Sequence, residues 1–382
     1  MNKFDSQCLS PKQRIEQLLD AKGWSQHDLA EIMGRPVQMV NQILAGTKSI
    51  TMVTARGLEA AFGKENGSAQ KWLLWQLEYQ IAMDAGKTED CSEVARRAKL
   101  HSQVPLRELV KRGWVPKCDS VEETEKEVAR FFGVTSVDSI IPPKFCARAK
   151  VSVPAQNVWA QRAWQMAAEL TQSGKYSAKK LRGSVAALRE CFGDPAKAVD
   201  ALELIAKAGV RLVFVQHLTK TRIDGAAFWL KPKTQPVIAL SMRFGRIDYF
   251  AFTLLHELLH ILEQHDSVLD TEILAANGEL SDHEHAANRW AAETLIPFQS
   301  MNEFLQATKG SPSRVAIERF AASIGIHAGI VTGQLQNRGV VGYSSHRDLL
   351  VDVRDVVLAQ RNSLQARGVA AFDGWLNQKE DE

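Results

Sequence analysis

Apolar residues recur at helical spacing in short segments from Pro11 to about Gly63. The segments IEQLLDAKG, SQHDLAEIMG, PVQMVNQILAG and TMVTARGLEAAFG each place apolar side chains three and four positions apart, which is typical of amphipathic helices. Gly34, Gly46 and Gly63 stand where three of these helices are expected to end. Residues 68–83 continue as another helix. The pattern predicts an all-α amino-terminal domain at residues 1–90.

The pattern changes after a polar stretch at residues 86–103. Residues 105–141 predict two helices around a loop, and a proline-bearing segment follows them. Beyond a boundary near Asn157, helices continue to about Ala208. The region from Val210 to Met242 then holds three apolar runs rich in β-branched and aromatic residues, which is typical of strands. The predicted divisions are a helical connector and linker at 91–156, an α+β domain at 157–345 and a helical carboxy-terminal tail at 346–382.

The second and third amino-terminal segments fit a helix-turn-helix. Counted from Gln26, Ala30 is the fifth residue, Gly34 the ninth and Val40 the fifteenth. A small residue lets the two helices approach, glycine forms the turn, and a β-branched residue packs the second helix on the first. The second helix, at about residues 36–45, then presents polar side chains suited to phosphates and base edges, unless this is a plain helical bundle. The predicted DNA-binding residues are Gln26, Arg35, Gln38, Asn41, Gln42 and Lys48.

Residues 11–85, including GRPVQMVNQILAGTKSIT and KWLLWQLEYQIAM, resemble the Cro-type helix-turn-helix regulators and especially the HigA-type antitoxins. The resemblance implies binding to a double-stranded DNA operator. Because helix-turn-helix proteins bind paired half-sites as dimers, we expect a homodimer on a pseudo-palindromic site.

The stretch FTLLHELLHIL, residues 252–262, contains a candidate metal site. His256 and His260 lie one helical turn apart on the same side, and Glu257 lies on the adjoining edge. Both imidazoles can bind one zinc ion, and Glu257 can take a proton from the activated water. The apolar neighbours predict a buried helix, where histidine and glutamate lose hydration unless they are paired. The alternative is that these are polar residues of a buried helix without a metal.

A zinc site with three protein ligands leaves one position open for water, so a third ligand is needed. The candidate stretch is residues 282–297, in which Glu284 lies on the same helical stripe as the packing residues. His265, His283 and His285 compete with it. The last two lie a helix edge away from that stripe, and His265 falls in the loop after the HExxH helix. We rank Glu284 first, although an exposed acidic side chain is an ordinary alternative.

The order of FTLLHELLHIL and EHAANRWAAETLIP resembles the signature of the ImmA/IrrE family of zinc-dependent peptidases, in which HExxH precedes an ExxANxFA helix that ends in proline. The resemblance covers roughly residues 157–345 and implies a zincin-like fold. It also implies that His256, His260 and Glu284 bind Zn²⁺ and that Glu257 is the catalytic acid and base.

Composition narrows the function less than the motifs do. Hydrophobic residues make up 45% of the chain and charged residues 24%, which is typical of a globular protein. A net charge of +3 is too small to indicate nucleic-acid binding by itself. The five scattered cysteines lack CxxC pairs, and we see no signal peptide or membrane-spanning run. We therefore expect reduced thiols and a cytoplasmic location.

These features predict a multidomain protein with an all-α helix-turn-helix domain and an α+β zincin-like domain. The expected function is a DNA-binding transcriptional regulator whose zinc-dependent endopeptidase domain cleaves a repressor-type or antitoxin-like protein in stress, phage or toxin–antitoxin control. The alternative is a HigA-like antitoxin or repressor whose metal-binding domain is a sensor or partner-binding module without proteolysis. Intact HExxH together with Glu284 favours the first. The sequence departs from the family at Leu259 and Trp290, where the family often has glycine and phenylalanine. These departures are expected to affect access of the substrate to the cleft rather than metal binding.

Overall fold

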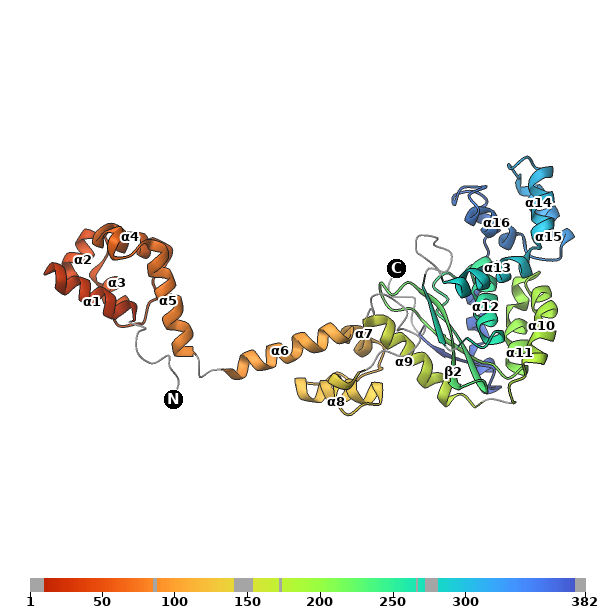
Figure 1. Cartoon of the computed structure of the whole chain (residues 1–382), viewed down its shortest axis with the longest axis horizontal. Coiled ribbons are helices and arrows are strands. Elements are labelled where there is room, and N and C mark those ends of the chain that lie inside the picture. Colours follow the sequence, from red (N-terminus) through yellow and green to blue (C-terminus); the bar gives the residue numbers. More distant parts are fainter. Residues whose placement is uncertain are drawn as a thin grey trace. The chain divides into compact units, whose positions relative to one another are not determined.

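The computed structural model describes residues 10–84, 88–140, 154–171, 174–265, 267–271 and 281–374 (Figure 1). The chain divides into two compact units, residues 1–97 (unit 1) and residues 98–382 (unit 2). The division falls within a helix, α6 (Thr88–Gln103), rather than at the predicted boundary after residue 90. Much of the polar stretch that was expected to separate two regions is therefore helical.

Unit 1 is all-α in its described part, as the helical spacing predicted. Its core contains Ile15, Leu29 and Trp72, and each is at most 1% exposed. Trp24, which is partly buried, packs against this core and stacks on Phe62 at 5.9 Å between ring centroids. The helices are α1 (Pro11–Lys22), α2 (Gln26–Ile32), α3 (Val37–Leu44), α4 (Met52–Phe62), the short 3₁₀ helix η1 (Lys64–Asn66) and α5 (Ala69–Asp84).

Glycine ends three helical segments of unit 1 where the sequence predicted it. Gly34, Gly46 and Gly63 have φ angles of 59°, 73° and 90°. Residues with a side chain rarely adopt this left-handed region, so glycine lets the chain leave a helix without strain. The expected helix ends are confirmed.

Unit 2 is built on a five-stranded mixed sheet with the order β4-β2-β3-β1-β5. β1 runs parallel to β3 and β5, whereas β2 is antiparallel to β3 and β4. The three apolar runs expected as strands correspond to β1, β2 and β3. The strands are β1 (Arg211–Val215), β2 (Ile223–Lys231), β3 (Gln235–Leu240), β4 (Ser267–Thr271) and β5 (Ala370–Asp373).

Helices cover both faces of this sheet (Figure 1). Because side chains alternate along a strand, Leu212 and Phe214 of β1 join one core cluster, and Val213 and Val215 join the other. The first cluster includes α10 (Ala178–Cys191), α11 (Ala198–Lys207) and α12 (Ile247–Leu262), and the second includes α9 (Pro154–Glu169). The HExxH helix α12 is therefore buried between the sheet and the other helices on the same face of it.

Further helices complete unit 2. The central one for the site is α13 (Asp282–Leu295), which packs along α12. The others are α7 (Leu106–Lys111), α8 (Val121–Phe132), η2 (Val137–Ser139), η4 (Pro195–Lys197), α14 (Phe298–Ala307), α15 (Arg314–Ser323), α16 (Ala328–Asn337), η5 (Arg347–Leu349), α17 (Arg354–Ala359) and α18 (Arg361–Ala366).

Two predicted divisions differ from the structure. The connector expected at residues 91–156 does contain the two predicted helices, α7 and α8, but they belong to unit 2, where Arg112 donates hydrogen bonds to the Gln216 and His217 carbonyls. The tail expected to be helical at residues 346–382 ends its described part in β5, an edge strand of the sheet. A four-residue strand has too little local pattern to be recognised, and its conformation is determined by pairing with β1. The linker residues 141–153 lie outside the described residues.

Among the described helices, no single one has the length and apolar character needed to cross a membrane, and only α15 and α16 pass that test together, bent by 115°.

Candidate metal centre and DNA-binding surface

Two predicted metal ligands come from consecutive turns of α12. His256, Glu257 and His260 are each 0% exposed because they lie within the apolar stretch that packs on the sheet. The start of this helix is stabilised by Asp248, whose carboxylate accepts hydrogen bonds of 3.0 and 2.6 Å from Arg246. Burial raises the pKa of Asp248, although the Arg246 guanidinium opposes this effect.

The third predicted ligand, Glu284, lies in the first turn of α13. The Ser281 hydroxyl caps this helix by accepting a hydrogen bond of 3.3 Å from the Glu284 amide. A carboxylate in the first turn is also favoured by the helix dipole. The cap therefore places Glu284 where its side chain reaches α12.

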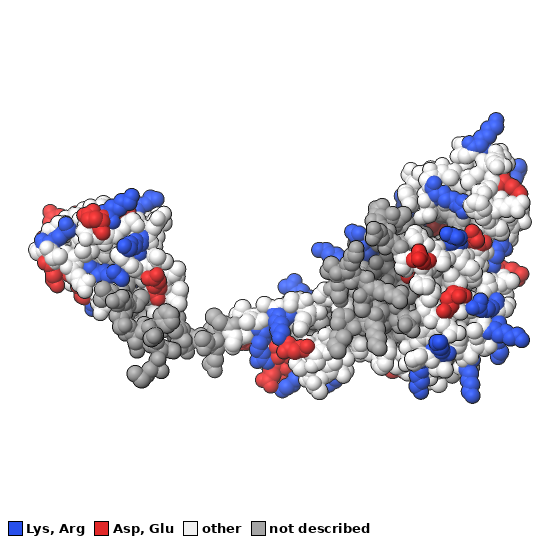
Figure 2. Space-filling model, viewed as in Figure 1, with Lys and Arg blue, Asp and Glu red and all other residues white. Residues whose placement is uncertain are grey.

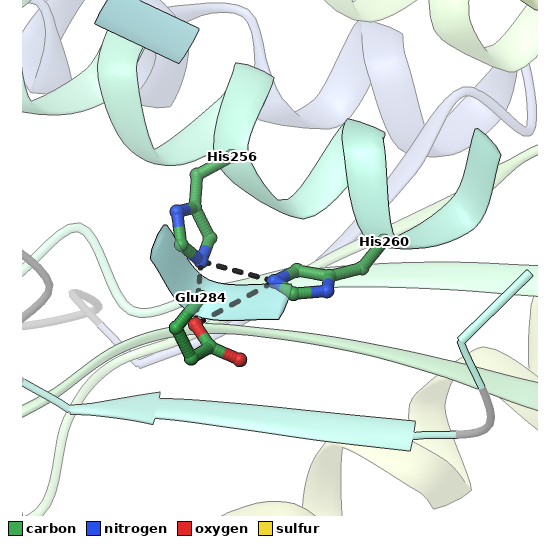
Figure 3. Close-up of side chains that lie close together, drawn as sticks. All are labelled: His256, His260 and Glu284. Atoms are coloured by element: carbon green, nitrogen blue, oxygen red, sulfur yellow. Dashed lines mark hydrogen bonds and ion pairs between the residues drawn. The ribbon is translucent and has the colours of Figure 1, made fainter. Parts of the chain in front are cut away.

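Figure 3 shows the three side chains pointing toward one another. His256 Nε2 lies 3.1 Å from Glu284 Oε2 and 3.1 Å from His260 Nε2, and His260 Nε2 lies 3.7 Å from Glu284 Oε2. Ligands held tetrahedrally on zinc, with bonds of about 2.0–2.2 Å, lie roughly 3.3–3.5 Å apart. Two imidazoles and a carboxylate in this arrangement fit a zinc ion and leave one position open.

His265 completes the surroundings of His260. Its Nδ1 lies 2.8 Å from His260 Nδ1, so the His260 ring can donate away from the cluster while its Nε2 faces Glu284. The turn after α12 brings it there: Gln264 has a left-handed φ of 56°, and the His265 amide bonds to the His260 carbonyl at 3.0 Å. The indole of Trp229 also donates to the His265 carbonyl, at 2.8 Å. Burial, followed by the nearby His260 and His283, lowers the pKa of His265.

The competing histidines are thus placed differently from the three predicted ligands. His265 lies beside the cluster as a hydrogen-bond partner, a role that the sequence reasoning missed. His283 packs against His265 at 4.3 Å between ring centroids, and both His283 and His285 are exposed on α13. No sequence signal marks the role of His265, because it depends on the turn at Gln264.

Glu257 lies against strand β2. A Cβ at Gly225 would overlap the Glu257 carboxylate, so glycine leaves space for the acid beside the sheet. A small pocket nearby is lined by Thr253 and Tyr249 of α12 and by the ion pair of Asp224 with Arg243, at 3.0 Å. Burial raises the pKa of Tyr249, so it stays protonated at neutral pH and can donate a hydrogen bond there.

In unit 1 the predicted DNA-binding side chains are all exposed. Ala30 and Val40 are buried between α2 and α3, as the helix-turn-helix pattern predicted. The surface residues, from the start of α2 to the segment after α3, are Gln26, Arg35, Gln38, Asn41, Gln42 and Lys48.

Charge alone does not mark the DNA-binding face. In the view of Figure 2, basic and acidic side chains are interspersed on unit 1. Sequence-specific binding would therefore depend on the polar side chains of α3 as well as on phosphate contacts.

Comparison with known proteins bears on unit 1. The helix-turn-helix family model matches residues 15–65, from α1 through η1. No curated protein and no solved structure matches the chain. The chain therefore contains an XRE-type helix-turn-helix domain at residues 15–65, which supports its assignment as a DNA-binding transcriptional regulator.

Proposed function

We propose that unit 2 is a zinc-dependent endopeptidase of the ImmA/IrrE kind, with a zincin-like fold, joined to the helix-turn-helix domain. One observation carries the proposal: His256, His260 and Glu284 converge within 4.8 Å of one another, and Glu257 lies on the same buried helix. Cleavage of a peptide bond is the reaction that this combination of residues suits best.

The metal ligands would be His256, His260 and Glu284. Zinc bound there supplies Lewis-acid activation of water and of the scissile carbonyl. His265 would support the site by accepting the Nδ1 proton of His260, which would leave His260 Nε2 unprotonated on the metal side.

Glu257 would act as the general base and acid. Its carboxylate takes a proton from the attacking water and then donates it to the leaving amine. The space at Gly225 accommodates this carboxylate, and the buried position of α12 limits access of bulk water.

The resemblance to the ImmA/IrrE peptidases, together with the fused DNA-binding domain, supports a proposal for the class of substrate. We propose that the regulator binds its operator as a homodimer in the cytoplasm and that the substrate is a repressor-type or antitoxin-like protein. Cleavage of such a protein would convert a stress, phage or toxin–antitoxin signal into a change of transcription.

The second candidate function is a HigA-like antitoxin or repressor in which the metal-binding unit is a sensor or partner-binding module. The helix-turn-helix match supports this function as well as the first, because DNA binding is common to both. The two functions can be told apart at Glu257, which proteolysis needs and sensing does not.

Glu257→Gln separates them. The amide cannot take up a proton, so a peptidase should keep zinc and DNA binding but lose cleavage of a co-expressed repressor by at least about 100-fold. The matched control is Glu263→Gln, an exposed glutamate just after α12, which should behave as wild type. Immunoblots of candidate repressors with a promoter reporter provide the measurement. Wild-type regulation by Glu257→Gln, without repressor fragments in either strain, would instead establish the sensor.

A further inference from the structure

A second cavity lies between α12, α13 and α16, apart from the metal-ligand cluster. It contains about 400 Å³ of empty space, including its open mouth. Phe252, Leu295 and Ile330, one from each helix, form its apolar lining. Apolar walls with a few polar groups are typical of small-molecule sites.

Helix α16 provides the polar groups. Ile330, Gln334 and Arg338 follow one another at intervals of four, so they lie on one face of the helix and its C-terminal cap. Gln334 is 8% exposed, and its Nε2 donates to the Ala292 carbonyl at 2.9 Å. This bond fixes the orientation of the amide, because the flipped amide would bring two oxygens together. In the described part of the chain, Gln334 Oε1 is a buried acceptor with no hydrogen-bond partner.

The charges around this cavity favour an anion. Arg338 is exposed at the cavity, and within the described ranges its guanidinium makes no ion pair. The one acidic side chain in the lining, Asp248, already accepts two hydrogen bonds from Arg246. The Asp248 charge is thus compensated, whereas the Arg338 charge is available to a ligand.

We propose that this cavity binds a small amphipathic carboxylate. An aromatic or branched aliphatic body packs against Phe252, Leu295 and Ile330, the carboxylate pairs with Arg338, and an N–H or O–H group donates toward Gln334 Oε1. Such chemistry is found in free aromatic and aliphatic acids and in the carboxy-terminal residue of a peptide. The site is independent of the proposed peptidase activity.

The cavity adjoins the two helices that carry the metal-ligand cluster. Phe252 precedes His256 by one turn of α12, and their ring centroids lie 6.3 Å apart. On α13, Ala292 and Leu295 continue the helical stripe that begins at Glu284. A molecule in the cavity therefore contacts both helices that carry the cluster.

The test is calorimetric titration of the full-length protein with N-acetyl-L-phenylalanine, its uncharged amide, and a tetrapeptide ending in phenylalanine with a free carboxylate. We expect saturable binding of at least one acid and at least tenfold weaker binding of the amide. Repeating each titration after zinc is removed with a chelator excludes coordination of the carboxylate by the metal. The result does not depend on cleavage, so failure of the peptidase proposal leaves it unaffected.

Variants locate the binding. Arg338→Met should weaken binding of the acids at least tenfold, and Ala292→Phe should abolish binding by filling the cavity. The matched control is Arg319→Met, an exposed arginine of α15 that does not line the cavity. Circular dichroism checks the folding of Ala292→Phe, while the exposed position of Arg338 keeps the test valid if that variant misfolds.

Each outcome is decisive. Tetrapeptide binding without binding of N-acetyl-L-phenylalanine assigns the cavity to a peptide terminus, and binding of both assigns it to small acids as well. The proposal is overturned if no probe binds, if acid and amide bind equally, or if Arg338→Met binds as tightly as wild type.

Discussion

In unit 1 the side chains assigned to DNA are exposed, whereas in unit 2 His256, Glu257 and His260 are fully buried. The exposed groups remain hydrated until DNA arrives, so they contribute little to the stability of their helices. The buried groups have lost their water and need partners within the protein. Substitutions of these exposed side chains in unit 1 should therefore change DNA binding without changing folding. Substitutions of the buried groups of α12 should change both zinc binding and folding.

The largest expected effect is at the proposed metal centre. His260→Ala should reduce zinc from about one ion per chain to almost none, because two ligands cannot hold the ion as three do. Metal analysis of the dialysed protein measures this, and His285→Ala, an exposed histidine of α13, is the control. Equal zinc content in wild type and His260→Ala would refute the ligand assignment.

The next effect concerns the partner of His260. His265→Ala should lower the affinity for zinc about 10- to 100-fold, which is the usual consequence of losing a group that orients a metal ligand. His265→Asn should restore part of the affinity, since its carbonyl oxygen can still accept the Nδ1 proton of His260. Competition with a chromophoric chelator gives the affinities. An unchanged affinity in His265→Ala would show that the contact at 2.8 Å has no role in metal binding.

A smaller effect is expected on the exposed surface of unit 1. Gln38→Ala and Asn41→Ala should each cost about 1–3 kcal/mol of discrimination between operator sequences, because amides pair with base edges. Lys48→Ala should weaken binding to all operator sequences alike. It should also lower the slope of affinity against salt concentration by about the amount that one phosphate contact contributes.

Gel shifts at several salt concentrations, with thermal unfolding of the same variants, measure these effects. Unit 1 should unfold at an unchanged temperature. A wild-type protein without sequence preference would contradict the assignment of α3 as the DNA-reading helix.

The smallest effect tests how a half-buried group outside the proposed metal centre responds to pH. His327 caps α16 by accepting the Gly329 amide at Nδ1, at 3.0 Å, and burial lowers its pKa. Its neutral form is therefore favoured in the folded state. The stabilisation is complete above the unfolded pKa of about 6.5 and is lost as the pH falls through the lower folded pKa.

Urea unfolding of unit 2 at pH 7.5 and 5.5 checks this. His327→Asn, which can cap a helix without titrating near neutrality, should lose less stability on acidification than wild type. An equal loss in both proteins would mean that other groups account for the pH dependence.

The parts of this protein that the sequence by itself determined are local. Ala30, Gly34 and Val40 lie within one helix-turn-helix, so their spacing alone predicts which side chains pack and which stay exposed. The one-turn separation of His256 and His260 likewise follows from helix geometry wherever the helix lies. Apolar runs of sufficient length also predicted β1 to β3.

Only the tertiary structure decided the contacts between distant segments. Glu284 reaches His256 because α13 packs along α12, and His265 meets His260 because a left-handed residue reverses the chain. β5 is a strand only because it pairs with β1, and the second cavity exists only where α12, α13 and α16 meet. Periodicity describes which face of an element is apolar, but which faces come together depends on the packing of the whole unit.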